Sequence, residues 1–411
     1  MMRQTAALLA LACVAEAAWK ALGPFGASLG CVVAAPPDDS VVYVCTWGGD
    51  AVLYRSTDFG VSWKRAGSVP ERGLCLAIDP GYPERLYLGA AQDIYRSTDA
   101  GASWMRDSLG YYVSIYDITV HPDSSSVVYA VGTALGADAR MAFLHSTDAG
   151  MSWTRTSPPG RSGSLFCVEV DPLNPERVYA GGCYSSSGTV PCLYLTTDMG
   201  ATFTELSPLI DDTQVMALSI HPEDPNVLCA GGLSGLYRST DRGSTWTQTV
   251  PEGTCFDLAV TPADADLVLA ATADKVLLST DAGGSWDSCG QALCGRYYRG
   301  VSAGRTQGSP MYAVNSLGFY RSTDRGETWA VSNRGLDMFG RIAAFGISPT
   351  DPEVVYTSFA LGFPPIPVYR TTDCGGSWTT HATPMSCGNA CGIAVSPYDP
   401  DLVFCLEGTV T

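Results

Sequence analysis

One segment recurs eight times along the chain and constrains the fold more than any other feature. Its common form is S/T-T-D-x-G-x-S/T-W, as in LYRSTDFGVSW, IYRSTDAGASW and LYRSTDRGSTW. The aspartates of the eight copies lie 40 to 50 residues apart. They are Asp58, Asp99, Asp148, Asp198, Asp241, Asp281, Asp324 and Asp373. Repeats of this length are typical of the four-stranded blades of a β-propeller.

A second motif lies upstream of these segments and completes the repeating unit. Examples are LAIDPGYPERLYLG and LSIHPEDPNVLCAGG, in which two apolar runs flank a turn rich in proline and aspartate. Proline lacks a backbone N–H and fixes φ, so it marks the end of the first strand. The unit is therefore predicted to run strand A, Pro/Asp turn, strand B, loop, strand C, aspartate turn, strand D.

The repeated aspartate has a structural interpretation. Its carboxylate can accept hydrogen bonds from nearby backbone N–H groups and so fix the turn between strands C and D. The glycine two residues later supplies a backbone angle that other residues resist, and the tryptophan anchors strand D against the blade. Because a catalytic carboxylate needs an environment of its own, eight equivalent aspartates are not expected to be catalytic.

Both ends of the chain carry partial repeats. Trp19 lies twelve residues before Cys31, as Trp63 lies twelve before Cys75, and so indicates an isolated strand D. The segment CGIAVSPYDPDLVFCLEG supplies strands A and B near the C-terminus. We therefore predict an all-β fold, a single propeller of about 8–9 four-stranded blades over residues 19–411, whose ring closes when the two ends meet. The closing blade then has three strands, or the propeller is truncated at its C-terminus.

The first residues resemble an export signal. A short basic start, MMRQ, precedes the apolar stretch TAALLALACVA, and Ala15-Glu16-Ala17 forms an A-x-A cleavage site. We predict a signal peptide over residues 1–18 and a secreted, periplasmic or cell-surface location. Lipid attachment at Cys13 and an uncleaved segment are the alternatives. No apolar run reaches the roughly 18–20 residues of a membrane-spanning helix, and no transmembrane segment is expected.

Charge and cysteine content narrow the classes of partner. The formal net charge is −17 with three lysines, which argues against nucleic acid or an anionic membrane as partner. Fifteen cysteines fit export. Cys183 and Cys192 flank one loop and are a candidate disulfide, whereas Cys31, Cys75 and Cys167 precede a proline by five residues and are interpreted as small buried side chains. No cysteine or histidine spacing suggests zinc, and no metal or cofactor is expected.

The repeated segment resembles the Asp box of BNR-repeat propellers, a superfamily that includes sialidases, xyloglucan hydrolases, sortilin-type receptors and photosystem II assembly factors. The resemblance covers almost the whole mature chain and implies the fold, with each Asp box at a C–D turn, but no particular chemistry. The chain lacks the Y/F-R-I-P segment of sialidases. Trp47 stands where xyloglucan hydrolases place a catalytic aspartate and Asp50 is displaced, which argues against hydrolysis.

A functional site is expected on the face opposite the Asp boxes. Strand direction alternates within a blade, so the B–C loops and D–A connections share that face, and the longest B–C loops are 133–140, 183–192 and 359–367. Arg72 and Arg341 each lie eight residues before a strand-A proline and could converge on an anion. The candidate ligand-binding residues are Trp47, Asp50, Tyr111, Tyr112, Arg140, Tyr184, Arg296, Arg341 and Phe363. No catalytic residue is predicted.

Three functions are compatible with these features. The first is a binding or scaffold module for an extracellular glycan, a peptide or a surface partner. The second is an extracellular glycoside hydrolase of xyloglucanase type, which needs two carboxylates about 5–10 Å apart across a pocket. The third is an assembly or sorting factor for another protein. The sequence favours the first, because no pair of acids is distinguished by its pattern.

Overall fold

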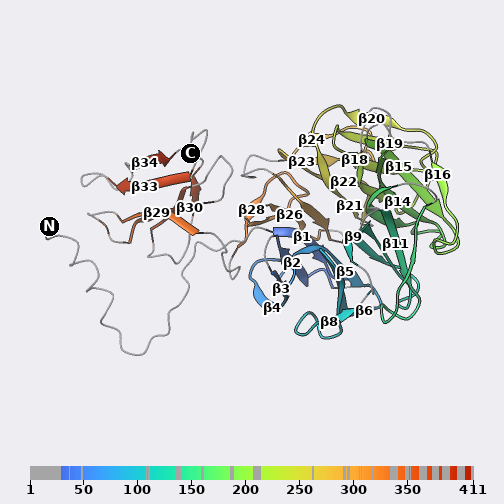
Figure 1. Cartoon of the computed structure of the whole chain (residues 1–411). Helices are drawn as coiled ribbons and strands as arrows, with labels where there is room; N and C mark the ends of the chain where they lie inside the picture. Colours follow the sequence, from blue (N-terminus) through green and yellow to red (C-terminus); the bar gives the residue numbers. More distant parts are fainter. Residues whose placement is uncertain are drawn as a thin grey trace. The chain divides into compact units, whose positions relative to one another are not determined.

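Seven four-stranded antiparallel sheets follow one another along residues 26–340 of the computed structural model (Figure 1). We call this part the ring unit; residues 1–25 and 341–411 form a second unit. The structure describes residues 29–36, 38–47, 50–107, 109, 112–135, 140–158, 162–185, 189–206, 214–261, 263–289, 293, 297–304, 306, 308–315, 318–333, 341–347, 351, 353–360, 368–372, 379–381, 389–395 and 403–408.

Each blade of the ring unit is built from one continuous segment of four strands. Blades 1 to 4 comprise β1 (Leu29–Ala34), β2 (Val42–Thr46), β3 (Ala51–Ser56), β4 (Lys64–Val69); β5 (Gly73–Asp79), β6 (Tyr82–Ala90), β7 (Ile94–Ser97), β8 (Met105–Asp107); β9 (Val113–Val120), β10 (Val128–Ala134), β11 (Arg140–Ser146), β12 (Thr154–Thr156); and β13 (Gly163–Val170), β14 (Val178–Ser185), β15 (Thr189–Thr196), β16 (Thr204–Leu206). Blades 5 to 7 comprise β17 (Val215–Ile220), β18 (Leu228–Gly232), β19 (Leu236–Ser239), β20 (Thr247–Val250); β21 (Cys255–Thr261), β22 (Asp264–Thr272), β23 (Val276–Ser279), β24 (Asp287–Ser288); and β25 (Gly300–Ala303), β26 (Met311–Asn315), β27 (Gly318–Ser322), β28 (Ala330–Val331).

Burial explains the sequence pattern of each strand. The second strand of a blade is covered by neighbouring blades on both faces, and β2, β10, β18 and β26 are buried along their whole length. Such strands are continuous apolar runs rather than alternating ones. The outermost strands β8, β12 and β16 are mostly exposed and only three residues long. The apolar core therefore lies between blades, near the middle of each sheet.

The prediction of a single ring of 8–9 blades is wrong. The ring unit has seven blades, and blade 1 takes all four strands from residues 29–69. In the described ring, blade 1 packs against blade 7, so the ring does not close through the predicted blade that combines a strand at Trp19 with strands A and B near the C-terminus. Trp19 itself lies outside the described residues. The eighth repeat builds β29 (Arg341–Ile347), β30 (Val355–Ala360), β31 (Val368–Thr371) and β32 (Thr379–His381), and this sheet belongs to the second unit.

The second unit also holds the predicted strands A and B near the C-terminus. They are β33 (Asn389–Val395) and β34 (Val403–Gly408), paired antiparallel, and β33 packs against β29. Strand pairs that pack in this way follow the blade pattern of the ring unit. Among the described residues, no helix is long and apolar enough to cross a membrane.

Blade 1 and blade 7 close the ring by side-chain contacts. In Figure 1, β1 lies beside β26, and β1 packs on β25 and β26. The indole N–H of Trp63 donates to the carbonyl of Ser332 at 2.8 Å, and its ring meets Phe319 edge-on with centroids 4.7 Å apart. Asp39, which is only 5% exposed, accepts hydrogen bonds from the backbone N–H and hydroxyl of Thr306 and from the hydroxyl of Ser309. No covalent link or shared strand closes the described ring.

The Asp boxes form the predicted turns. In blade 1, Asp58 accepts hydrogen bonds from the hydroxyl of Ser56 at 2.6 Å and from the backbone N–H of Ser62 at 2.9 Å. The Ser56 hydroxyl in turn accepts from the N–H of Gly60, whose φ of +77° suits glycine. The same bonds recur at Asp99, Asp148, Asp198, Asp241, Asp281 and Asp324. Asp373 lies outside the described residues.

The two faces of the ring unit are separated as expected. The Asp-box residue Phe59 donates its backbone N–H to the carbonyl of Ser40, in the A–B turn of its own blade. Ala100 donates to the carbonyl of Glu84, near the start of β6 and just after the A–B turn. On the opposite face, Ala91 in a B–C loop donates to the carbonyl of Arg72 in a D–A connection. The A–B turns and Asp boxes therefore share one face, and the B–C loops and D–A connections share the other.

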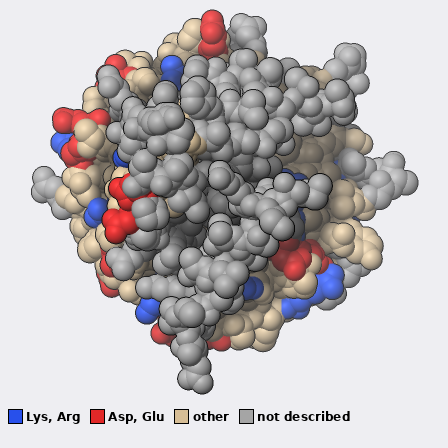
Figure 2. Space-filling view, turned by 90° about the vertical axis from the view of Figure 1, so that its left-hand side faces the viewer, with Lys and Arg blue, Asp and Glu red and all other residues tan. Residues whose placement is uncertain are grey.

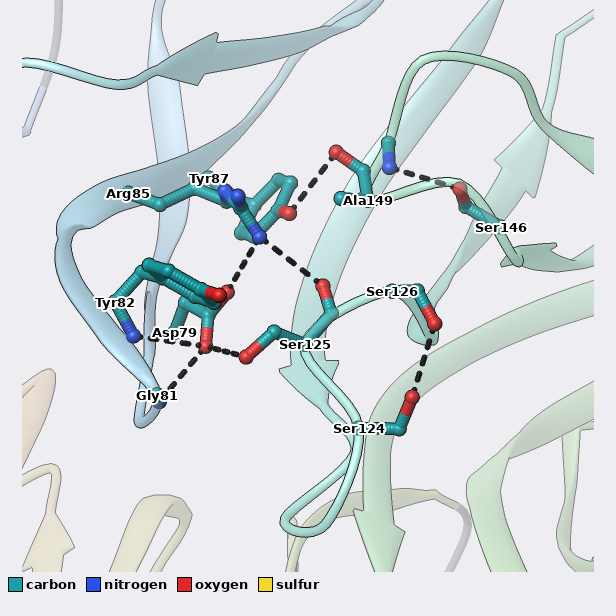
Figure 3. Close-up of polar contacts among 11 residues, drawn as sticks. Asp79, Gly81, Tyr82, Arg85, Tyr87, Ser124, Ser125, Ser126, Ser146 and Ala149 are labelled. Atoms are coloured by element: carbon teal, nitrogen blue, oxygen red, sulfur yellow. Dashed lines mark hydrogen bonds and ion pairs between the residues drawn. The ribbon is translucent and has the colours of Figure 1, made fainter.

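A buried ion pair ties neighbouring blades together on the Asp-box face (Figure 3). Asp79, which is fully buried, accepts hydrogen bonds from Arg85, from the backbone N–H of Gly81 and from the hydroxyl of Ser125 in the next blade. Arg85 also donates to the carbonyl of Ser125 at 3.2 Å, and the Tyr87 hydroxyl donates to Ala149. These bonds satisfy the buried carboxylate, so the A–B turns serve as structural joints.

We expect Asp39→Ala to destabilise the ring because it removes three hydrogen bonds between blades 1 and 7. Hydrogen bonds to a buried charge are the stronger kind, so the free energy of unfolding should fall by about 2–3 kcal/mol. The control is Asp38→Ala, since Asp38 is exposed and bonds only to nearby Ser40. Equal denaturation midpoints for the two variants would show that Asp39 does not hold the ring closed.

Candidate functional site

The seven innermost strands surround a central cavity of about 340 Å³. Each of the first six carries a β-bulge at an equivalent position, where one residue is skipped in the pairing with the second strand. A bulge re-aims a side chain, and the bulged residues all line the cavity. They are Gly30, Leu74, Tyr116, Phe166, Met216 and Phe256, and Arg299 takes the equivalent place in blade 7. We call these seven residues the bulge ring.

Gly30 is the gap in the bulge ring, and Trp47 fills it. Trp47 follows β2, and a Cβ at position 30 would lie 2.8 Å from Trp47 Cε3, so the indole can pack there only against glycine. The guanidinium carbon of Arg72 lies 3.9 Å from the ring centroid of Trp47, and that of Arg299 lies 4.0 Å from it. We call Trp47, Arg72 and Arg299 the arginine platform.

The arginine platform concentrates positive charge in an acidic protein. Burial, and then the charge of Arg72, lower the pKa of Arg299, which also stacks 5.4 Å from the ring centroid of Phe256. Neither arginine forms an ion pair with any described residue. On the face shown in Figure 2, by contrast, the described acidic and basic side chains are interspersed. Two stacked, unneutralised guanidinium groups form a site for an anion.

Two carboxyl groups lie one residue after the bulges of blades 3 and 6. Asp117 accepts hydrogen bonds from the backbone N–H groups of Ile118 and Val168, and Asp257 from those of Leu258 and Val301. Each therefore links its inner strand to that of the next blade. Burial raises the pKa of both carboxyls to about 7, despite these hydrogen bonds. Burial, followed by the charges of these two groups, raises the pKa of Glu169 well above its usual value.

The structure brings together only part of the predicted ligand site. Trp47 packs against Gly30 and Arg299, which both line the cavity, whereas Arg341 begins β29 in the second unit. Asp50 and Tyr112 are exposed, Arg140 begins β11, and Tyr184 packs against the core between blades 3 and 4. None of these four lines the cavity. Tyr111, Arg296 and Phe363 lie outside the described residues.

The predicted Cys183–Cys192 disulfide is not formed in the structure. Strand register pairs Cys183 with Pro191 and Cys192 with Gly182, so the two side chains leave opposite faces of the hairpin. Neither cysteine is in a disulfide. Cys75 and Cys167 are buried, as expected, whereas Cys31 is half-buried beside the cavity. No group of three or more His, Cys, Asp or Glu in the described segments is arranged to bind a metal.

Sequence reasoning missed most of the bulge ring. Tyr116, Phe166 and Phe256 each lie six residues before the proline that ends strand A. The sequence therefore shows that they occupy equivalent positions in their blades. The sequence does not reveal the bulge. Regular strand alternation would place these side chains on a face of the blade, whereas the bulge turns them toward the cavity. Arg299 was harder to find, since blade 7 lacks that proline and the alignment of its inner strand with the others is lost.

Comparisons with known proteins agree on the propeller fold. A family model described as Sortilin-Vps10, "Sortilin, neurotensin receptor 3", matches residues 51–162. The crystal structure of the GH74 enzyme from Niastella koreensis is 17% identical over 94% of this chain and 70% of that one, with a TM-score of 0.63. An ancestral GH74 enzyme is 15% identical over 96% and 68%, with a TM-score of 0.66.

Smaller propellers are also similar in structure. YCF48 from Cyanidioschyzon merolae is 14% identical over 74% of this chain and 97% of that one, with a TM-score of 0.51. The corresponding values for U3-55K are 12%, 72%, 90% and 0.53. No curated protein matches the sequence significantly. Identities this low establish the fold and leave the activity to the chemistry of the site.

The raised pKa values of Asp117 and Asp257 predict a pH-dependent stability. The folded state binds these protons more tightly than the unfolded state, in which the pKa is near 3.8. Stability contributed by the protonated carboxyls is therefore lost as the pH rises from about 4 through about 7. Asp117→Asn should reduce the loss of unfolding free energy between pH 5 and pH 8 by on the order of 1–3 kcal/mol.

Calorimetry of the wild type, Asp117→Asn and the control Asp123→Asn at pH 5 and pH 8 measures this loss of unfolding free energy. Asp123→Asn is the control, since Asp123 is exposed on an A–B turn and should leave the pH dependence unchanged. An Asp117→Asn protein with the same loss of stability as the wild type would contradict a protonated carboxyl at this position.

Proposed function

We propose that this chain, a β-propeller of the Asp-box (BNR) superfamily, is an exported binding protein that holds a carboxylate-bearing peptide segment of a partner at its channel mouth. The observation that carries the proposal is the arginine platform. Arg72 and Arg299 stack on Trp47 and have no carboxylate partner among the described residues. A site with two preorganised guanidinium groups gains most from a ligand that supplies the missing negative charge.

Preorganisation makes the arginine platform suitable for binding. A free arginine side chain loses rotamer freedom when it binds a ligand, which weakens the interaction. Here the indole of Trp47 already orients both guanidinium planes, and Gly30 lets the indole approach the inner strand closely. The half-buried position of Arg299 also reduces screening by solvent. A carboxylate accepts two parallel N–H donors from such a group.

The surroundings of the arginine platform favour a peptide over a sugar. Of the platform residues, Arg299 lines the central cavity together with Leu74, Phe166 and Met216, and apolar side chains of a peptide can pack against them. A neutral glycan would instead require many hydroxyl and amide groups around the site. The match of residues 51–162 to a family model described as a neurotensin receptor is compatible with this choice.

Export is supported by the N-terminal segment and the cysteine content. A basic start, an apolar stretch and an A-x-A site precede the propeller, and fifteen cysteines are unusual for a cytosolic protein of this kind. A partner in that setting would be a secreted or surface protein. A scaffold role for the seven blades follows, because a rigid ring presents the channel mouth in a fixed geometry.

Hydrolysis is the second candidate, favoured by the two titrating carboxyls on the inner strands of blades 3 and 6. A glycosidase, however, needs one carboxyl kept protonated and another kept ionised by different environments. Asp117 and Asp257 have matching environments: each accepts two backbone N–H groups and burial raises each pKa to about 7. Their likeness suits a structural link between blades better than an acid and a nucleophile.

Arg299→Ala should weaken peptide binding by about 10- to 100-fold, the effect of losing a charge-assisted contact of roughly 1.5–3 kcal/mol. The probe is a combinatorial library of hexapeptides rich in Asp and Glu, with fluorescence polarisation of the selected peptides as the measurement. Arg299→Lys keeps the charge but loses the planar stacking, so it should recover only part of the affinity.

The matched control is Arg242→Ala, which removes one exposed arginine from an Asp box on the other face. It should leave peptide affinity unchanged. Equal affinity of the wild type and Arg299→Ala would contradict the proposal. Binding of neutral xyloglucan oligosaccharides in place of peptides, or release of reducing ends from them, would favour a glycan-binding or hydrolytic protein.

A further inference from the structure

Cys31 and Cys45 form a pair of facing thiols in blade 1. They are register partners on the antiparallel strands β1 and β2, so both side chains lie on the same face of the sheet. Directly opposed residues have Cα atoms about 4.5–5.5 Å apart, within the range of about 4.4–6.8 Å seen in disulfides.

The equivalent cysteines of other blades lack this arrangement. Cys75 and Cys167 occupy the same place on their inner strands, but their register partners are Gly89 and Gly181. A Cβ on either glycine would collide with the facing sulfur, at 2.4 Å and 2.7 Å. In blades 2 and 4 the thiol therefore faces a glycine. In blade 1 the residue that faces Cys31 is a second cysteine, Cys45.

We propose that Cys31 and Cys45 form a disulfide that joins the two strands carrying Gly30 and Trp47. The reaction is thiol–disulfide exchange with a small disulfide such as oxidised glutathione. One thiolate attacks the small disulfide and releases one thiol, and the second thiolate then displaces the other. The protein loses two protons and two electrons, and the small disulfide is reduced to two thiols. Cys31 is half-buried beside the cavity, and so can be reached first.

The position of the bond gives it a consequence for the arginine platform. Cys31 directly follows Gly30, and Cys45 lies two residues before Trp47. The bond therefore ties β1 to β2 where the indole of Trp47 packs on Gly30. A Cβ on residue 30 would lie only 2.8 Å from Cε3 of that indole. Strand separation at this point would move the indole away from both guanidinium groups. The effect on ligand binding rests on the proposed function, whereas formation of the bond does not.

Peptide mapping tests formation of the bond in the full chain. Trypsin cleaves after Lys20 and Arg55, so residues 21–55 are released as one peptide with Cys31 and Cys45 as its only cysteines. After folded protein is incubated with oxidised glutathione at pH 8.5, then alkylated in denaturant, this peptide should be unalkylated and about 2 Da lighter than the reduced form. Peptides that contain Cys75 and Cys167 should be alkylated.

Three variants make the test specific. Cys31→Ser and Cys45→Ser should each leave the remaining thiol open to alkylation, and Cys75→Ser should leave the lighter peptide unchanged. Oxidation should raise the melting temperature of the wild type by several degrees and have no such effect on Cys31→Ser. Alkylation of both thiols in the oxidised wild type, or a mixed disulfide with glutathione at Cys31 that persists, would overturn the proposal.

A binding measurement separates the bond from the platform. If the proposed function holds, the oxidised wild type should bind the selected hexapeptides more tightly than the reduced protein, and Cys31→Ser should not respond to oxidation. A lighter peptide without any change in affinity would confirm the disulfide and overturn its link to Trp47. Loss of binding in Arg299→Ala with no lighter peptide would leave the proposed function intact and reject the disulfide.

Discussion

The contact between blade 1 and blade 7 is the interaction on which the rest of the ring depends. Six of the seven blade junctions follow from the order of the chain, because consecutive blades are joined by short connections. The seventh must be held by side chains, and Trp63, Asp39 and Ser332 supply it. It also creates the candidate site, since Arg299 comes from blade 7 and Trp47 from blade 1. Closure and binding therefore share one interface.

The repeat explains why the site lies where it does. Each blade repeats the same Asp-box turn, six of the seven share the inner-strand bulge, and Arg299 takes the equivalent place in blade 7, so seven equivalent positions surround the channel. A ring of equivalent positions can bind nothing specific until some of them differ. Gly30 and Arg299 are adjacent departures in the bulge ring, and Trp47 and Arg72 gather around them. The local loss of symmetry produces a compact cationic site within a chain of net charge −17.

Sequence alone was sufficient for the repeating parts of the fold and insufficient for their closure. The Asp-box turn, the strand order and the separation of the two faces were predicted because each depends on residues close together in the chain. The predicted number of blades was wrong because it depends on which distant blades pack together. Trp19 and the C-terminal strands suggested a shared closing blade, whereas the described ring closes by contact between blades 1 and 7. Arg299 lies three residues after the predicted Arg296, but only the folded ring shows that it reaches Trp47.

A double-mutant cycle on Arg72 and Arg299 tests the central claim most directly. If both guanidinium groups hold one carboxylate of the peptide, the two alanine substitutions are coupled, and their effects on affinity do not add. The account predicts that Arg72→Ala weakens binding much less in an Arg299→Ala background than in the wild type, by about threefold or more. Strictly additive losses would mean that the two arginines act on separate ligand groups, and would contradict a shared site built on Trp47.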